Sequence, residues 1–125
     1  MTWIYYDSKT GNVERFVTRL KEHRNWNIQK INDSLQLTNP GHLITYTTGI
    51  GDVPASTIRF LETNSALIHT VTSSGNKNWG ANFALAATKI SERFKLPVLM
   101  QFELSGTMTD LQRFIDQIEG NIYGN

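Results

Sequence analysis

The chain has 125 residues, of which 39% are hydrophobic and 18% charged, and it contains no cysteine. These values fit one globular domain, residues 1–125, and exclude a disordered chain, a disulfide scaffold and any metal or iron–sulfur site held by cysteine. The net charge of +1 is too small to indicate nucleic acid, and neither a membrane-length apolar run nor a secretory leader is present. We therefore expect a cytoplasmic protein that binds neither nucleic acid nor membranes.

Five short segments carry the apolar, aromatic and β-branched residues typical of strands. They cover residues 2–6, 26–31, 43–47, 67–72 and 98–102. The turn signal Asn39-Pro40-Gly41 precedes the third segment. Pro97 opens the fifth, at a position where a proline removes no sheet hydrogen bond.

Four helices are expected between and after these strands, each from an apolar stripe at helical spacing. The stripes comprise Val13, Phe16, Val17 and Leu20; Ile58 and Leu61; Phe83, Ala87, Ile90 and Phe94; and Leu111, Phe114, Ile115 and Ile118. Pro54 suits the first turn of the second helix. Thr107 and Asp110 resemble a capping box before the fourth helix, which we expect to end at Gly120, with a loose tail over residues 121–125.

The alternation of strands and helices predicts a parallel sheet between two helical layers. The segment 35–41 is too short for a full helix, so one crossover is trimmed. The fold class is therefore α/β, a three-layer sandwich with five parallel strands and helices on both faces. Ligands of such sheets bind at the carboxyl ends of the strands.

Three polar segments that contain glycine follow the first, third and fourth strands, at residues 7–12, 47–52 and 73–80. In the first, Gly11 permits close backbone approach, and the unpaired amides of a helix start suit a phosphate. The spacing is neither that of a Walker loop nor that of a Rossmann fingerprint. An ordinary capped turn is the alternative interpretation.

The second and third segments offer a different kind of surface. Two glycines around Ile50 leave the backbone bare, so that it can approach a ligand edge. Trp79, between Asn78 and Gly80, could stack on a planar heterocycle whose polar edge binds the nearby amides, or it could be a core anchor. Together the three segments favour a planar ligand that carries a phosphate.

Other chemistries lack the residues they need. His23, His42 and His69 have no metal-ligand spacing, and no nucleophile elbow is present. Glu103, at the end of the fifth strand near the expected site edge, is either a hydrogen-bond acceptor that supports the site or a surface carboxylate, and we favour the surface carboxylate. A basic run in the first helix, made of Arg15, Arg19, Lys21 and Arg24, favours a solvated helix face over a docking patch for an acidic partner.

The sequence resembles a known family at these same segments. Ser8-Lys9-Thr10-Gly11-Asn12 is similar to the phosphate loop of flavodoxins. Residues 45–49, Val53-Pro54, residues 74–83 and residues 102–107 are similar to the NrdI family, the small flavodoxin-like activators of class Ib ribonucleotide reductases. The match runs in the same order over nearly the whole chain, and its segment Ser74-Gly75-Asn76-Lys77-Asn78-Trp79-Gly80 is fairly specific.

The resemblance implies a flavodoxin-like fold with strand order 2-1-3-4-5 that binds one FMN. Carried over by position, the phosphate would be held by Ser8, Lys9 through its backbone, Thr10, Gly11, Asn12 and Val13. Thr47, Thr48 and Gly49 would line one edge of the flavin ring. Ser74, Gly75, Asn76, Asn78 and Gly80 would border the other side, with Trp79 stacked on the ring.

The departures from ordinary flavodoxins fit the NrdI family better. The 47–52 loop has no aromatic residue, Val13 stands where a threonine is usual, and the chain is not acidic. The resemblance implies that a reductase reduces the flavin, which passes superoxide made from O₂ to the small subunit NrdF for assembly of its metal and radical site. No independent substrate turnover is expected. A general one-electron flavodoxin shuttle and a module without cofactor are the alternatives.

Overall fold

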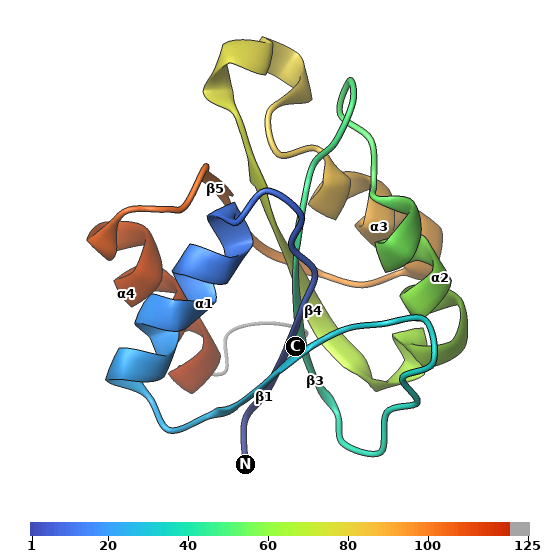
Figure 1. Cartoon of the computed structure of the whole chain (residues 1–125), viewed down its shortest axis with the longest axis vertical. Coiled ribbons are helices and arrows are strands. Elements are labelled where there is room, and N and C mark those ends of the chain that lie inside the picture. The colour runs from blue at the N-terminus through green and yellow to red at the C-terminus, as the bar shows by residue number, and fades with distance from the viewer. Residues whose placement is uncertain (121–125) are drawn as a thin grey trace.

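One five-stranded parallel sheet organises the chain in a computed structural model, which describes residues 1–120 (Figure 1). The strands are β1 (Trp3–Tyr6), β2 (Asn27–Lys30), β3 (Gly41–Tyr46), β4 (Ile68–Gly75) and β5 (Val98–Glu103). Their order is β2-β1-β3-β4-β5. The expected strand order and parallel sheet are therefore confirmed.

Helices cover both faces of the sheet (Figure 1). Helices α1 (Asn12–His23) and α4 (Met108–Glu119) pack on one face, and α2 (Ala55–Asn64) and α3 (Ala86–Phe94) on the other. Short 3₁₀ helices, η1 (Ser65–Leu67) and η2 (Lys77–Asn82), lie before and after β4. None of the helices within residues 1–120 is long and apolar enough to cross a membrane.

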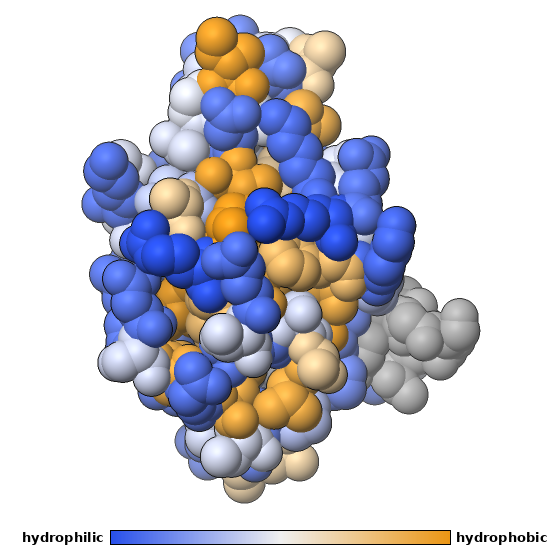
Figure 2. Space-filling view, turned by 90° about the vertical axis from the view of Figure 1, so that its right-hand side faces the viewer, coloured by the Kyte–Doolittle hydropathy of each residue, from blue (hydrophilic) through white to orange (hydrophobic). Residues whose placement is uncertain are grey.

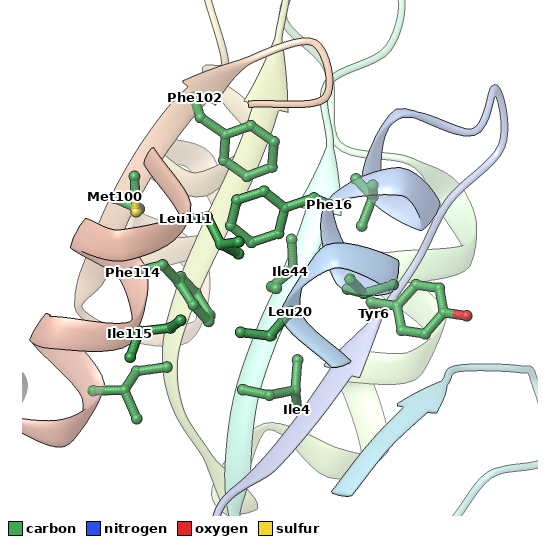
Figure 3. Packing of buried hydrophobic residues seen from close by; sticks show 13 residues of the cluster. Ile4, Tyr6, Phe16, Leu20, Ile44, Met100, Phe102, Leu111, Phe114 and Ile115 are labelled. Carbon is green, nitrogen blue, oxygen red and sulfur yellow. The ribbon is translucent and has the colours of Figure 1, made fainter. Parts of the chain in front are cut away.

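The core beneath α1 and α4 is built around three phenylalanines (Figure 3). Phe16 stacks on Phe102 with ring centroids 4.4 Å apart, and Phe114 meets Phe16 edge-on at 5.5 Å. Burying such aromatic rings removes a large apolar area from water, and the stacked geometry adds to that gain. This packing fixes α1, and with it the loop between β1 and α1.

The second core lies under α2 and α3, around Tyr5, Leu43 and Phe60. The crossover between β2 and β3, residues 31–40, contains no helix, as expected from its length. Its backbone is held by one side chain of α2: Asn64 accepts from the Leu37 amide at 2.9 Å and donates to the Leu35 carbonyl at 3.0 Å. A strap of chain thus replaces a helix on this part of the sheet.

Three expectations about elements are corrected. The buried residues of α2 are Thr57, Phe60, Leu61 and Asn64, whereas Ile58 is only half-buried, because the helix begins one residue after Pro54 and turns a different stripe inward. Helix α3 begins at Ala86 rather than at Phe83. Gly80 and Ala84 both have positive φ, at 57° and 48°, and such conformations interrupt a helix.

The third correction concerns β4, which continues to Gly75 and so includes Ser73 and Ser74, expected in a loop. These two small side chains are buried within the sheet. At α4 the expectations hold: Thr107 and Asp110 form the capping box, and the helix ends at Glu119, next to Gly120. The loose tail expected over residues 121–125 lies outside the described residues.

The surface over α2 and α3 mixes residue types (Figure 2). Apolar residues appear there in several patches separated by hydrophilic ones, a pattern typical of protein surfaces. The apolar side chains that matter for a site lie instead at the carboxyl edge of the sheet.

Candidate functional site

The segments after β1, β3 and β4 meet at the carboxyl edge of the sheet, at the upper end in Figure 1. A cavity of about 360 Å³ lies between them. It is lined by Lys9, Thr10, Asn12, Tyr46, Thr47, Thr48, Gly49, Ser74, Gly75, Asn76, Trp79 and Leu104. A volume of this size is within the range of small-molecule sites.

Five of the expected site residues do not line this cavity. The Ser8 hydroxyl oxygen accepts from the Glu14 amide at 3.2 Å, and the Val13 side chain is buried in the core. Gly11 forms the turn into α1, whereas Asn78 and Gly80 lie further along η2. Each of these residues is a sequence neighbour of a residue that does line the cavity.

The first loop presents unused backbone donors. Within residues 1–120, the amides of Thr10, Gly11, Asn12 and Val13 meet no hydrogen-bond acceptor. Gly11 has φ 97°, a left-handed conformation that glycine adopts without strain, and this conformation turns the chain into the helix. Four free amides at the positive end of a helix form an arrangement suited to an anion such as phosphate.

A buried carboxylate supports this loop from beneath. Asp7 accepts hydrogen bonds from the hydroxyls of Ser56 and Thr57 in the first turn of α2, the latter at 2.7 Å. Burial raises the pKa of the neighbouring Tyr46 phenol, and the Asp7 charge raises it further. In the sequence, Asp7 is marked only by its place directly after a strand.

The second loop is a tight hairpin. Thr48 and Asp52 exchange backbone hydrogen bonds of 2.9 and 2.7 Å, and Gly49 and Gly51 between them have positive φ. Lys89 of α3 pairs with the Asp52 carboxylate at 3.1 Å. Ile50, at the tip, is 78% exposed. The hairpin is thus held at its base while it presents an apolar tip beside the cavity.

The third segment places an aromatic face at the opening. Trp79 of η2 is 39% exposed, so the alternative of a core anchor is wrong. Ser74 donates to the Leu104 carbonyl at 2.7 Å, which joins the floor of the cavity to the residue after β5. Glu103 is half-buried and accepts from the Lys77 amide at 3.1 Å, which favours the interpretation as a supporting acceptor over that of a simple surface carboxylate.

Sequence reasoning missed two cavity residues, Tyr46 and Leu104. Both lie at a carboxyl end of a strand, Tyr46 as the last residue of β3 and Leu104 as the first after β5. The rule that ligands bind at this edge could have identified them. Their apolar character concealed them in a search for polar groups.

The basic run of α1 is not simply a solvated helix face. Arg24 binds Glu119 through two nitrogens, and Arg19 donates to the carbonyls of Ser105 and Gly106. Arg15 donates to Ser105 Oγ at 2.9 Å and to Asn12 Oδ1 at 2.6 Å. The arginines therefore tie α1 to α4 and to the loop before it.

A doubly wound parallel sheet with its cavity between these three loops defines a flavodoxin-like protein. The sequence profile of the family described as NrdI flavodoxin-like matches residues 4–116. The chain therefore belongs to the NrdI family.

Two relatives support this assignment, and one solved structure shares the fold. The chain is 47% identical to "Protein NrdI" of Bacillus licheniformis, over 95% of this chain and 88% of that protein. It is 44% identical to the "SPbeta prophage-derived protein NrdI" of Bacillus subtilis, over 91% and 88%. A solved flavodoxin, the WrbA-like protein from Agrobacterium tumefaciens, shares the fold with a TM-score of 0.55 at 12% identity, over 90% of this chain and 88% of that one.

Proposed function

We propose that this protein binds one FMN non-covalently in the cavity at the carboxyl edge. The phosphate would be held by the free amides from Thr10 to Val13 and the side chains of Thr10 and Asn12. The ring would lie between the Thr47–Gly49 backbone and Trp79, with Asn76 and Gly75 at its polar edge. The observation that carries this proposal is the row of amides without acceptors beside a cavity of suitable size, in a chain of the NrdI family.

The residues present fit this group chemically. A dianionic phosphate needs donors and positive potential, which the start of α1 and Arg15 supply. A flavin ring needs an aromatic or apolar contact, and Trp79, Tyr46 and Leu104 offer it. Its polar edge needs small residues that allow the backbone to approach, as at Gly49 and Gly75.

When bound, the flavin would supply the one-electron reduction of O₂ to superoxide, after a separate reductase has reduced it. We propose that the superoxide is delivered to NrdF, the small subunit of class Ib ribonucleotide reductase, for assembly of its metal and radical site. The contribution of the chain is to bind, orient and partly expose the group. No substrate of its own is required, so the protein acts as an activator rather than as an independent enzyme.

The rim of the cavity supports docking of a partner. Trp79 and Leu104, which line the cavity, are 39% and 44% exposed, and Ile50, next to the lining residue Gly49, is 78% exposed. Exposed apolar residues gathered at one place mark interaction surfaces more often than scattered ones do. The hairpin has no aromatic residue that would close the cavity from its side, which favours access of O₂.

The first experiment is the visible spectrum of the purified protein and an FMN titration of any colourless fraction. Flavin absorption with one FMN per chain is expected. Thr10→Val should weaken FMN binding, whereas Thr38→Val, an exposed residue in the 31–40 strap, is the matched control. A colourless protein that ignores added FMN would support the module without cofactor and contradict the proposal.

The second experiment separates the activator from a general electron shuttle. The reduced flavoprotein is mixed with metal-loaded NrdF under O₂, and radical yield is measured by electron paramagnetic resonance, with and without superoxide dismutase. We expect radical formation that the dismutase suppresses. A protein that binds FMN normally but gives no radical with NrdF would instead be a one-electron shuttle.

A further inference from the structure

A hydrogen-bonded clamp crosses the edge of the phosphate-binding loop. Arg15, one turn into α1, donates through Nε to Ser105 Oγ at 2.9 Å and through Nη2 to Asn12 Oδ1 at 2.6 Å. Ser105 Oγ donates in turn to the same Asn12 Oδ1 at 3.0 Å. Arg15 and Ser105, about ninety positions apart in the sequence, thus both hold the side-chain amide of Asn12.

This clamp determines which way the Asn12 amide faces. A guanidinium can only donate hydrogen bonds, so the Asn12 atom that faces Arg15 must be the carbonyl oxygen. With both neighbours on Oδ1, the Nδ2 group makes no protein hydrogen bond within residues 1–120. Asn12 lines the cavity, and the two hydrogens of its Nδ2 are not used by hydrogen bonds within residues 1–120.

The clamp also brings a positive charge to the loop. Arg15 Nη1 lies 2.9 Å from the place where a Cβ at Gly11 would stand, so only glycine leaves room for this position of the guanidinium. No carboxylate within residues 1–120 forms an ion pair with Arg15. Its charge is therefore not neutralised locally and adds to the potential of the helix start.

We propose that Arg15 and Ser105 are positioning residues that make the site selective for a phosphorylated flavin, by holding the Asn12 amide with its donors toward the phosphate. This inference rests on the proposed FMN site and extends it to the discrimination of FMN from riboflavin. The mechanism is geometric and electrostatic. An oriented amide needs no reorganisation on binding, and the uncompensated charge favours a dianion.

The test compares binding of FMN and of riboflavin by fluorescence quenching in Arg15→Gln and Arg19→Gln. Arg19 anchors the same β5–α4 loop, through the Ser105 and Gly106 carbonyls, but does not touch Asn12. We expect Arg15→Gln to weaken FMN about tenfold, the effect of one charge-assisted hydrogen bond, and to leave riboflavin within about twofold. Arg19→Gln should leave the ratio of the two affinities unchanged.

Two further variants separate the parts of the clamp. Arg15→Lys keeps the charge but cannot bridge Asn12 and Ser105 at once, so it should recover less than half of the lost free energy. Asn12→Asp keeps the acceptor toward Arg15 and replaces the donor with a carboxylate oxygen, so it should abolish the preference for FMN. Thermal melting of each variant verifies that the fold is retained.

The outcomes are distinguishable. If both arginine variants lose the same affinity for FMN as for riboflavin, Arg15 only anchors the loop and the inference is overturned. Full recovery in Arg15→Lys would attribute selectivity to charge alone and overturn the positioning role. If the wild-type protein binds FMN no more tightly than riboflavin, this inference is overturned but the proposed function still stands. If the protein does not bind FMN, both are overturned.

Discussion

His42 should make the stability of this protein depend on pH between neutrality and pH 5. The side chain is 3% exposed at the amino end of β3, with Nδ1 2.8 Å from Thr70 Oγ1 and its ring centroid 5.4 Å from that of His69. Burial, and to a smaller extent the charge of the neighbouring His69, lower the pKa of His42 to about 4. The ordinary value, which the unfolded chain takes, is 6.5.

The sign follows from which state binds the proton more readily. The unfolded chain takes up the proton near pH 6.5, whereas the folded chain does so only near pH 4. The contribution to stability is therefore fully present above pH 6.5 and is lost as the pH falls toward 4. Integrating over the two pKa values gives a loss of about 2 kcal/mol between pH 7.5 and pH 5, a range in which most carboxylates stay ionised.

The assay is urea unfolding at pH 7.5 and pH 5 for wild type, His42→Gln and His23→Gln. His23 is exposed on α1, so its variant should keep the wild-type difference between the two pH values. His42→Gln should reduce that difference by about 2 kcal/mol, whatever its stability at neutral pH. If wild type and His42→Gln lose the same free energy on acidification, burial does not hold His42 neutral and the reasoning fails.

Three further predictions test packing and the site. A Cβ at Gly75 would lie 2.3 Å from the Ala84 amide nitrogen, so Gly75→Ala should destabilise the fold by about 1–3 kcal/mol in urea unfolding. If the variant is as stable as wild type, the backbone at Gly75 and the backbone at Ala84 can move apart without cost. Phe16→Ala removes the ring stacked on Phe102 and should lower the free energy of unfolding by about 3–5 kcal/mol in the same assay. A decrease of less than about 1 kcal/mol would contradict the close packing of this core. Trp79→Ala should retain the melting temperature and weaken FMN binding by about 1–3 kcal/mol, and unchanged affinity would remove Trp79 from the site.

The sequence predicted the layers of the fold because apolar periodicity reports directly which faces are buried. The stripe of α1 was located correctly for this reason, and the capping box of α4 was located because Thr107 and Asp110 form a local motif. Propensity could not locate the start of α3, since the positive φ of Ala84 comes from tertiary packing and has no local signature. The predicted end of β4 was wrong for a similar reason, because Ser73 and Ser74 adopt strand conformation through pairing with the neighbouring strands β3 and β5.

For the site, the sequence predicted the three loops but not the contacts that link them. Thr10, Thr48 and Trp79 could be predicted because strand ends share one edge. The contact of Arg15 with Ser105 spans two segments that no periodicity relates. Asp7 was missed because nothing in the local sequence distinguishes a buried aspartate from an exposed one. Its burial depends on hydrogen-bond partners such as Thr57 of α2, which are distant in the sequence.

The strap of residues 31–40 divides the molecule into regions of unequal local stability. It starts at the carboxyl end of β2, where the Ile31 amide donates to the Tyr6 carbonyl at 2.9 Å, and further along it is fastened by the amide group of Asn64 and by the half-buried side chains of Leu35 and Leu37. Segments with few buried contacts exchange their amide hydrogens through local opening, ahead of the core. We therefore expect the amides of the strap around Leu35 and Leu37 to exchange ahead of those in the central strands.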